Sequence, residues 1–109
     1  MNKFDYQNFI MFTGDSANIY VTVYDCDGEV VPLTDCSIDW ICDIDDNTVI
    51  SKATDDGSIT VDLVKQEFVV HLTPEDTENL SATSYPHKAI IVDYEGNRST
   101  ILKGFVSFK

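Results

Sequence analysis

Short runs of alternating apolar and polar residues recur along the whole chain, and they constrain its fold more than any other feature. A period of two is typical of half-buried β-strands, and residues that favour turns separate these runs. The expected strands are residues 9–12, 18–25, 29–33, 36–44, 48–54, 58–64, 67–72, 85–94 and 98–108. The sequence therefore predicts an all-β fold: one domain over residues 1–109, an antiparallel β-sandwich of about seven to nine strands.

The segment CSIDWICDI, residues 36–44, has the clearest alternation. Asp39 and Asp43 would share one face of this strand, and that face must contact water to tolerate two carboxylates. The opposite face is apolar and is expected in the core: Ile38, Trp40, Cys42 and Ile44. One wet face favours an antiparallel sandwich over a parallel α/β sheet.

The segment HLTPEDTENL, residues 71–80, is the one place with a complete helix-start signal. Thr73 is a suitable N-cap, and Pro74 fits the first helical position. Glu75 and Asp76 add negative charge to the first turn, where the helix dipole favours it. We expect one short helical turn near residues 74–80.

The chain is strongly acidic, with 19 Asp and Glu against 7 Lys and Arg and a formal net charge of −12. No basic residue lies between Lys3 and Lys52. Nucleic acids and anionic lipids require a cationic surface, so neither is an expected partner. The acidity either keeps a solvated surface soluble or marks a half of the chain that meets a basic partner.

Three cysteines, Cys26, Cys36 and Cys42, show no zinc-like spacing. The first residues lack the apolar run of a signal peptide, and no segment reaches the length of a membrane span. We therefore expect synthesis in a reducing cytoplasm and small, buried thiols. The glycosylation sequons at Asn79 and Asn97 carry no meaning in that compartment.

No catalytic, cofactor-binding or metal-binding residue is expected, and an enzyme is not predicted. The acidic residues around Gly28 invite a calcium interpretation, but a hairpin turn accounts better for this segment, as it does for residues 43–47 and 55–57. A weak cation site remains open if these loops meet at one end of the sandwich. His71 and His87 lack a nucleophile motif and are interpreted as ordinary strand residues.

The segment LTPEDT, residues 72–77, resembles the crossing between the fifth and sixth strands of antibody variable domains. Tyr85 then stands near the position of the corner tyrosine, and Trp40 resembles the core tryptophan of the third strand. Residue 87, two positions after Tyr85, is His rather than Cys, so the resemblance implies an immunoglobulin-like sandwich without its disulfide. Trp40 would then pack on aliphatic residues: Val21, Val23, Val70 and Ile91.

A second resemblance covers most of the chain, from Tyr24 to Phe108. The segments VYDCDGEVVPLT, IDWICDID, HLTPEDTENL and GNRSTILKG follow one another as in small structural modules of tailed bacteriophages. They resemble the N-terminal domain of phage baseplate upper proteins. The resemblance implies a non-enzymatic virion protein of the neck, tail or baseplate, made in the bacterial host cytoplasm. Its expected partners are other virion proteins or further copies of itself, and it implies no cofactor.

Aromatic residues near both ends of the chain are the candidate interface: Phe4, Tyr6, Phe9, Phe105 and Phe108. Such rings often anchor interfaces, although they could equally complete the core of the domain itself. An alternative function is a carbohydrate- or receptor-binding module that uses its loops, with Tyr24 or Tyr94 near Asp93. A third is a calcium-stiffened adhesion domain.

Overall fold

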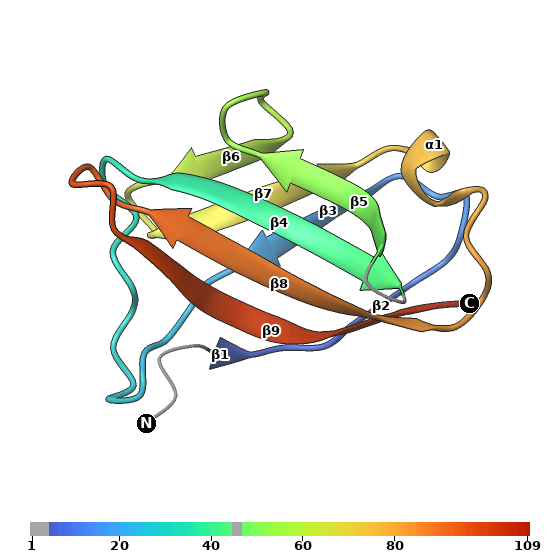
Figure 1. Cartoon of the computed structure of the whole chain (residues 1–109), viewed down its shortest axis with the longest axis horizontal. Coiled ribbons are helices and arrows are strands. Elements are labelled where there is room, and N and C mark those ends of the chain that lie inside the picture. Colours follow the sequence, from blue (N-terminus) through green and yellow to red (C-terminus); the bar gives the residue numbers. More distant parts are fainter. Residues whose placement is uncertain (1–4, 45–46) are drawn as a thin grey trace.

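The computed structural model describes residues 5–44 and 47–109 and places two β-sheets face to face (Figure 1). The larger, six-stranded sheet contains β1 (Asp5–Tyr6), β2 (Phe9–Met11), β4 (Ser37–Ile44), β5 (Asn47–Ala53), β8 (Ser84–Val92) and β9 (Arg98–Phe108). The smaller, three-stranded sheet contains β3 (Ala17–Val21), β6 (Ile59–Asp62) and β7 (Glu67–Leu72). The helix α1 (Pro74–Thr77) lies on the connection from β7 to β8.

The strand order is that of an immunoglobulin-like sandwich. The large sheet runs β1-β9-β8-β4-β5, with β2 also paired to β9, and the small sheet runs β3-β7-β6. Apart from the parallel pairs that β1 and β2 form with β9, the paired strands are antiparallel. The sheets thus form the two facing layers of a β-sandwich. The predicted all-β sandwich is confirmed.

Strand boundaries match the sequence-based expectation best in the second half of the chain. β7 and β9 have the expected bounds, whereas β3 ends at Val21 instead of continuing to residue 25. The expected strand at 29–33 is wrong, because only an isolated bridge joins Tyr24 to Val30. The short strand β1 was not expected, and it forms because residues 5–6 pair with β9.

The predicted helical turn is confirmed as α1, which spans four residues. The backbone N–H of Thr73 donates to the Asp76 carboxylate (2.7 Å), which closes a capping box. The same carboxylate pairs with Nζ of Lys52 on β5 (2.7 Å). This ion pair ties α1, which lies on the connection from the small sheet to the large sheet, to strand β5 of the large sheet.

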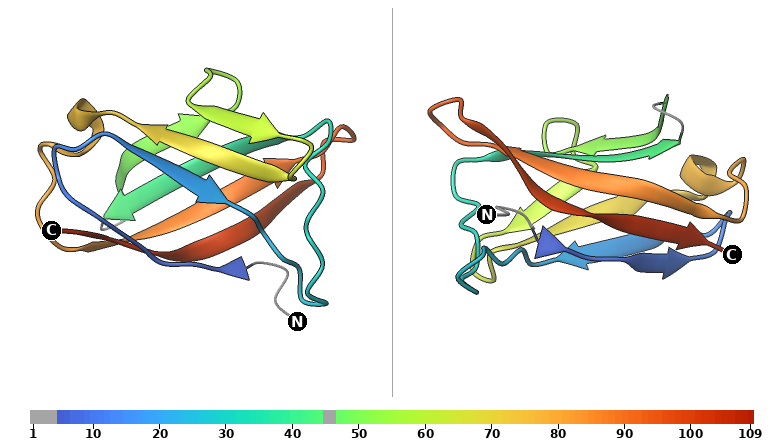
Figure 2. Two further views of the ribbon diagram at one scale, coloured as in Figure 1. Left: turned by 180° about the vertical axis from the view of Figure 1, so that it is seen from behind. Right: turned by 60° about the horizontal axis from the view of Figure 1, so that its bottom comes forward.

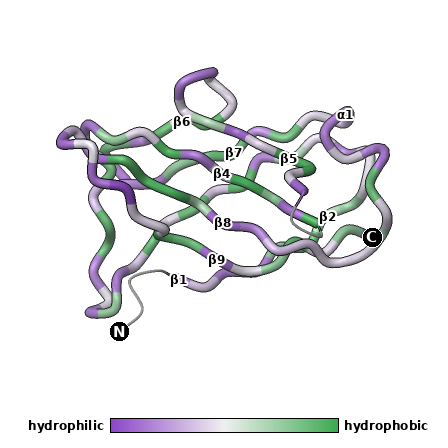
Figure 3. The backbone as a smooth tube through the Cα atoms, in the orientation of Figure 1, coloured by the Kyte–Doolittle hydropathy of each residue, from purple (hydrophilic) through white to green (hydrophobic). Residues whose placement is uncertain are grey.

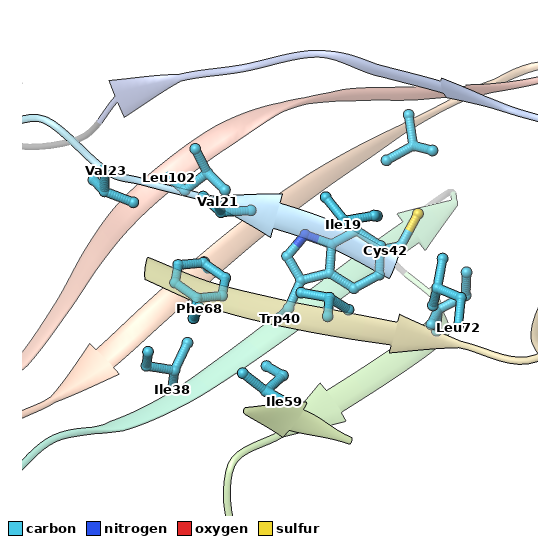
Figure 4. Close-up of a cluster of buried hydrophobic side chains, with 14 of the residues drawn as sticks. Ile19, Val21, Val23, Ile38, Trp40, Cys42, Ile59, Phe68, Leu72 and Leu102 are labelled. Carbon is cyan, nitrogen blue, oxygen red and sulfur yellow. The ribbon is translucent and has the colours of Figure 1, made fainter. Parts of the chain in front are cut away.

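The core lies between the sheets and is centred on Trp40 (Figure 4). The aliphatic residues expected around this ring all belong to the same buried cluster: Val21, Val23, Val70 and Ile91. The inward face of β4 is confirmed for Ile38, Trp40 and Cys42, but not for Ile44, which is exposed at the end of the strand. Figure 3 shows hydrophobic strand segments and hydrophilic connections.

Tyr85 forms the expected tyrosine corner. Its hydroxyl donates to the backbone carbonyl of Ser81 (3.1 Å), four residues earlier in the connection from α1. Its ring packs edge-on against Phe108, with the centroids 5.6 Å apart. This hydrogen bond anchors the chain where it enters the large sheet.

Candidate functional site

An open groove of about 350 Å³ crosses the outer face of the large sheet, over β1, β9, β8 and the end of β4. Strand register explains its lining. Tyr6, Lys103 and Lys88 form one cross-strand row, because Tyr6 pairs with Lys103 and Lys103 pairs with Lys88. Phe105 and Pro86 form the next row. The groove is therefore lined by the aromatic side chains of Tyr6 and Phe105, with Lys88 and Lys103 beside them.

The structure divides the candidate interface residues between this groove and the core. Tyr6 and Phe105 are 57% and 44% exposed and line the groove together. Phe108 is 2% exposed, and Phe9 is partly buried against the core. Phe4 lies outside the described residues. Positions 105 and 108 are an odd number apart, so alternation along β9 already requires that they face opposite sides.

Side chains from the break between β1 and β2 hold the edge of the groove. Asn8 Oδ1 accepts the backbone N–H of Phe105 (2.8 Å). The side chain of Gln7 donates from Nε2 to the Thr22 carbonyl (2.9 Å), which ties this edge to the chain beyond β3. The first contact holds the backbone of Phe105, and the second holds the residue that follows Tyr6.

The floor of the groove includes His87 and Gly104. His87 is buried, with Nδ1 accepting the indole N–H of Trp40 (3.1 Å) and Nε2 facing the Gln7 carbonyl (2.7 Å). These partners require a neutral ring with its proton on Nε2. Burial lowers the pKa of His87, and the hydrogen bond to Gln7 offsets part of that effect. His87 lies on β8, as expected of a strand residue, and its buried ring bridges the Trp40 indole and the Gln7 backbone.

Alternation along β8 carried a signal for this contact, since Tyr85, His87 and Ala89 share one face. The sequence did not reveal the partner, because Trp40 lies on another strand.

Charge in the groove is mixed. Lys88 and Lys103 lie directly opposite each other on neighbouring strands, an arrangement that is unfavourable for like charges. Asp43 lies at the far end, where its carboxylate accepts the Thr48 hydroxyl (3.1 Å). The groove thus contains two of the 7 basic residues of the chain together with one carboxylate.

Acidic residues of two turns bind their own backbone. Asp25 Oδ1 accepts the N–H groups of Asp27 (2.9 Å) and Glu29 (3.0 Å), which supports the hairpin interpretation over a calcium loop. Asp93 uses Oδ1 in the same way in the turn before β9, and these hydrogen bonds hold its pKa below the ordinary value. The carboxylate predicted to stand beside Tyr94 is thus engaged within its own turn.

The turn at 55–57 is likewise closed by its own side chains, because Asp56 accepts the backbone N–H and the hydroxyl of Ser58. The turn at 43–47 lies partly outside the described residues. Among the residues that the structure describes, no three His, Cys, Asp or Glu side chains gather as metal ligands would.

The remaining candidates lie away from the groove. His71 bridges the small sheet, with Nδ1 2.8 Å from the Asn18 side chain and Nε2 2.9 Å from the Thr60 hydroxyl. The expectation of buried thiols holds for Cys42, whereas Cys36 is partly exposed and Cys26 is exposed. Neither His71 nor any of the three cysteines lines the groove.

Comparison with protein-family models gives no match for this chain, and comparison with curated protein sequences gives none either. Within residues 5–44 and 47–109, no helix has the length and hydropathy needed to cross a membrane.

Proposed function

We propose that this protein is a non-enzymatic structural component of a tailed-bacteriophage virion, in the neck, tail or baseplate, and that it acts by protein–protein assembly. The order of its phage-like segments and its immunoglobulin-like sandwich support this proposal. The observation that carries it is the groove in which Tyr6 and Phe105 are exposed side by side.

The groove has the chemistry of a docking site for another virion protein. Exposed aromatic side chains fixed on strands serve as interface anchors because little conformational entropy is lost when they are buried. Lys88 and Lys103 lie beside these anchors. A partner that complements this surface would place an apolar side chain between Tyr6 and Phe105 and a carboxylate near the lysines.

Labelling tests the location. An antibody fragment or gold label against this chain should decorate one position on purified virions in negative-stain images. Virions that carry no label would refute the proposal.

Substitution tests the groove. Phe105→Glu should reduce incorporation into virions at least about tenfold, because it places a carboxylate in the anchor position. Tyr94→Glu is the matched control, since Tyr94 is also an exposed aromatic residue but lies outside the groove. Equal incorporation of the two variants would exclude the groove as the docking site.

One observation favours the alternative of a carbohydrate-binding module: Asp43 lies in the same groove as Tyr6 and Phe105. Aromatic rings beside a carboxylate offer both an apolar surface and a hydrogen-bond acceptor to a sugar. A glycan array separates the two functions. Binding that Phe105→Glu abolishes would favour the carbohydrate function, and an array without binding would favour assembly.

A further inference from the structure

The edge of the small sheet formed by β3 has outward-pointing backbone groups. His71 N–H donates to a backbone carbonyl next to β6 (2.9 Å), so the backbone groups of His71 face β6 and those of Val70 face β3. Val70 pairs with Ile19. It follows that the N–H and C=O groups of Asn18 and Tyr20 point away from β7, toward the open edge.

This open edge borders a groove of about 440 Å³ between β2 and β3, the seam where the two sheets meet. Figure 2 shows these two strands next to each other in its right-hand view. Ile10 on β2 is 72% exposed and Tyr20 on β3 is 62% exposed, and both line the groove. Large apolar side chains therefore lie beside the edge of β3, where backbone N–H and C=O groups point outward.

The seam is uncharged although the molecule is strongly acidic. Segments 6–13 and 16–24 contain no Asp, Glu, Lys or Arg in a chain of net charge −12. Strand edges are ordinarily protected by charges, prolines or bulges. Lys52 lies on the edge strand β5, and Asp62 lies on the four-residue edge strand β6, but β3 carries no such protection.

From these observations we propose that two copies of this chain pair through β3. The antiparallel pair would join their small sheets into one continuous sheet about a two-fold axis. A second copy is the occupant that this edge fits, because the outward backbone groups of Asn18 and Tyr20 can pair with each other across such an axis and the seam carries no charge. Two molecules of this net charge repel each other, and the repulsion is weakest where the approaching surfaces carry no charge. The inference concerns a surface separate from the groove of Tyr6 and Phe105 and does not depend on the proposed function.

The hydrogen bonds already present limit the register. The carbonyl of Thr22 would be the next outward group along the chain, but it accepts the side-chain N–H of Gln7 (2.9 Å). Pairing is thus confined to Asn18 and Tyr20, with Asn18 opposite Tyr20 of the second copy and the two-fold axis at Ile19. Each such pair exchanges two backbone hydrogen bonds.

Sedimentation velocity of the full chain tests this proposal from about 1 µM to about 1 mM, the range of moderate to weak self-association. We expect a concentration-dependent dimer that strengthens with added salt, because salt screens the repulsion between the copies. A wild-type protein that stays monomeric over this range would overturn the proposal.

Tyr20→Pro is the sharpest variant. It removes an N–H that β7 does not use, so the native sandwich should remain while the dimer weakens at least about tenfold. An unchanged dimer in folded Tyr20→Pro would overturn the proposal. Circular dichroism verifies that the variant is folded.

A second pair of variants keeps the test valid if Tyr20→Pro does not fold. Ile10→Glu places a charge in the seam and should dissociate the dimer, whereas Val64→Glu places the same charge on an exposed residue away from the seam and should leave it intact. Equal dimerisation of these two variants would overturn the proposal. Amide exchange gives a direct reading, since the N–H groups of Asn18 and Tyr20 should exchange more slowly as the protein concentration rises.

Discussion

The indole N–H of Trp40 donates a 3.1 Å hydrogen bond to Nδ1 of His87, and both side chains are buried between the sheets. His87 stands two residues after the corner tyrosine, where antibody domains have a disulfide cysteine. In this sandwich the core tryptophan therefore contacts a histidine at the position where antibody domains have a cysteine of the disulfide that links the two sheets. The other ring nitrogen of His87 reaches Gln7, so one side chain connects β4, β8 and the segment between β1 and β2.

This contact predicts a stability that depends on the protonation of His87. The folded protein lowers the pKa of His87, so the unfolded chain takes up its proton first as the pH falls. The resulting stabilisation is present above about pH 6.5 and is lost below it, by up to about 1.4 kcal/mol per pH unit. Urea unfolding at a series of pH values measures this decline.

His87→Gln is the variant that isolates this effect, because glutamine can accept from Trp40 and donate to Gln7 without titrating between pH 5 and 7. The difference in unfolding free energy between wild type and His87→Gln should shrink as the pH falls from 7 to 5. His71→Gln should retain the wild-type decline. A pH-independent difference for His87→Gln would contradict the prediction.

Gly104→Ala should be one of the most damaging single substitutions in the large sheet. A Cβ at this position would lie 1.8 Å from the Gln7 carbonyl oxygen and 2.9 Å from Nε2 of His87. The backbone would have to move, and we expect a loss of about 3 kcal/mol or more. Gly57→Ala, which meets no atom within 4 Å, should cost only about 1–2 kcal/mol from its positive φ. Thermal unfolding of both variants measures the two losses. A much larger loss for Gly104→Ala than for Gly57→Ala would show a steric cost in addition to the conformational one.

Asp76→Ala should destabilise the protein by about 2 kcal/mol, because it removes the cap of α1 and leaves Lys52 without its carboxylate. Partial burial raises the pKa of Asp76, but the hydrogen bonds and charge of Lys52 and the hydrogen bonds of Thr73 outweigh that effect and lower it. This stabilisation is therefore present above about pH 4 and is lost below it. Chemical unfolding at pH 7 measures this loss of unfolding free energy. Glu75→Ala is the control, and its unfolding free energy should stay within about 0.5 kcal/mol of the wild-type value.

Tyr85→Phe should cost about 1 kcal/mol, since it removes the hydrogen bond to Ser81 and keeps the ring on Phe108. Tyr94→Phe at an exposed turn serves as the control and should be neutral. A neutral Tyr85→Phe in urea unfolding would mean that the corner hydrogen bond adds no stability.

Alkylation should distinguish the three cysteines. Burial, aided by the charge of Asp43, raises the pKa of the Cys42 thiol to about 12, so this residue should stay unmodified in the native protein. Partial burial and the charges of Asp93 and Asp35 raise the pKa of Cys36. Mass spectrometry after iodoacetamide treatment should find Cys26 modified first, and rapid modification of native Cys42 would contradict the burial.

Features that depend on neighbouring residues could be predicted from the sequence. The helix start at Thr73 and Pro74 is one, because capping acts over a few residues. The strands β7 and β9 are others, because each is a run of strand-favouring residues next to a local boundary signal, Pro74 after β7 and Gly96 before β9. The corner tyrosine followed from the resemblance of this crossing to that of antibody variable domains, and its hydrogen bond spans four residues.

Features that depend on partners distant in the chain could not be predicted. β3 ends at Val21 because its partner β7 begins at Glu67, and beyond this point only an isolated bridge joins Tyr24 to Val30. Tyr6 and Phe105 meet because β1 pairs with β9, some hundred positions later in the chain. Alternation determines which residues share a face of a strand, whereas only the packing of the two sheets determines which face is buried, and this difference placed Phe108 in the core and Phe105 in the groove.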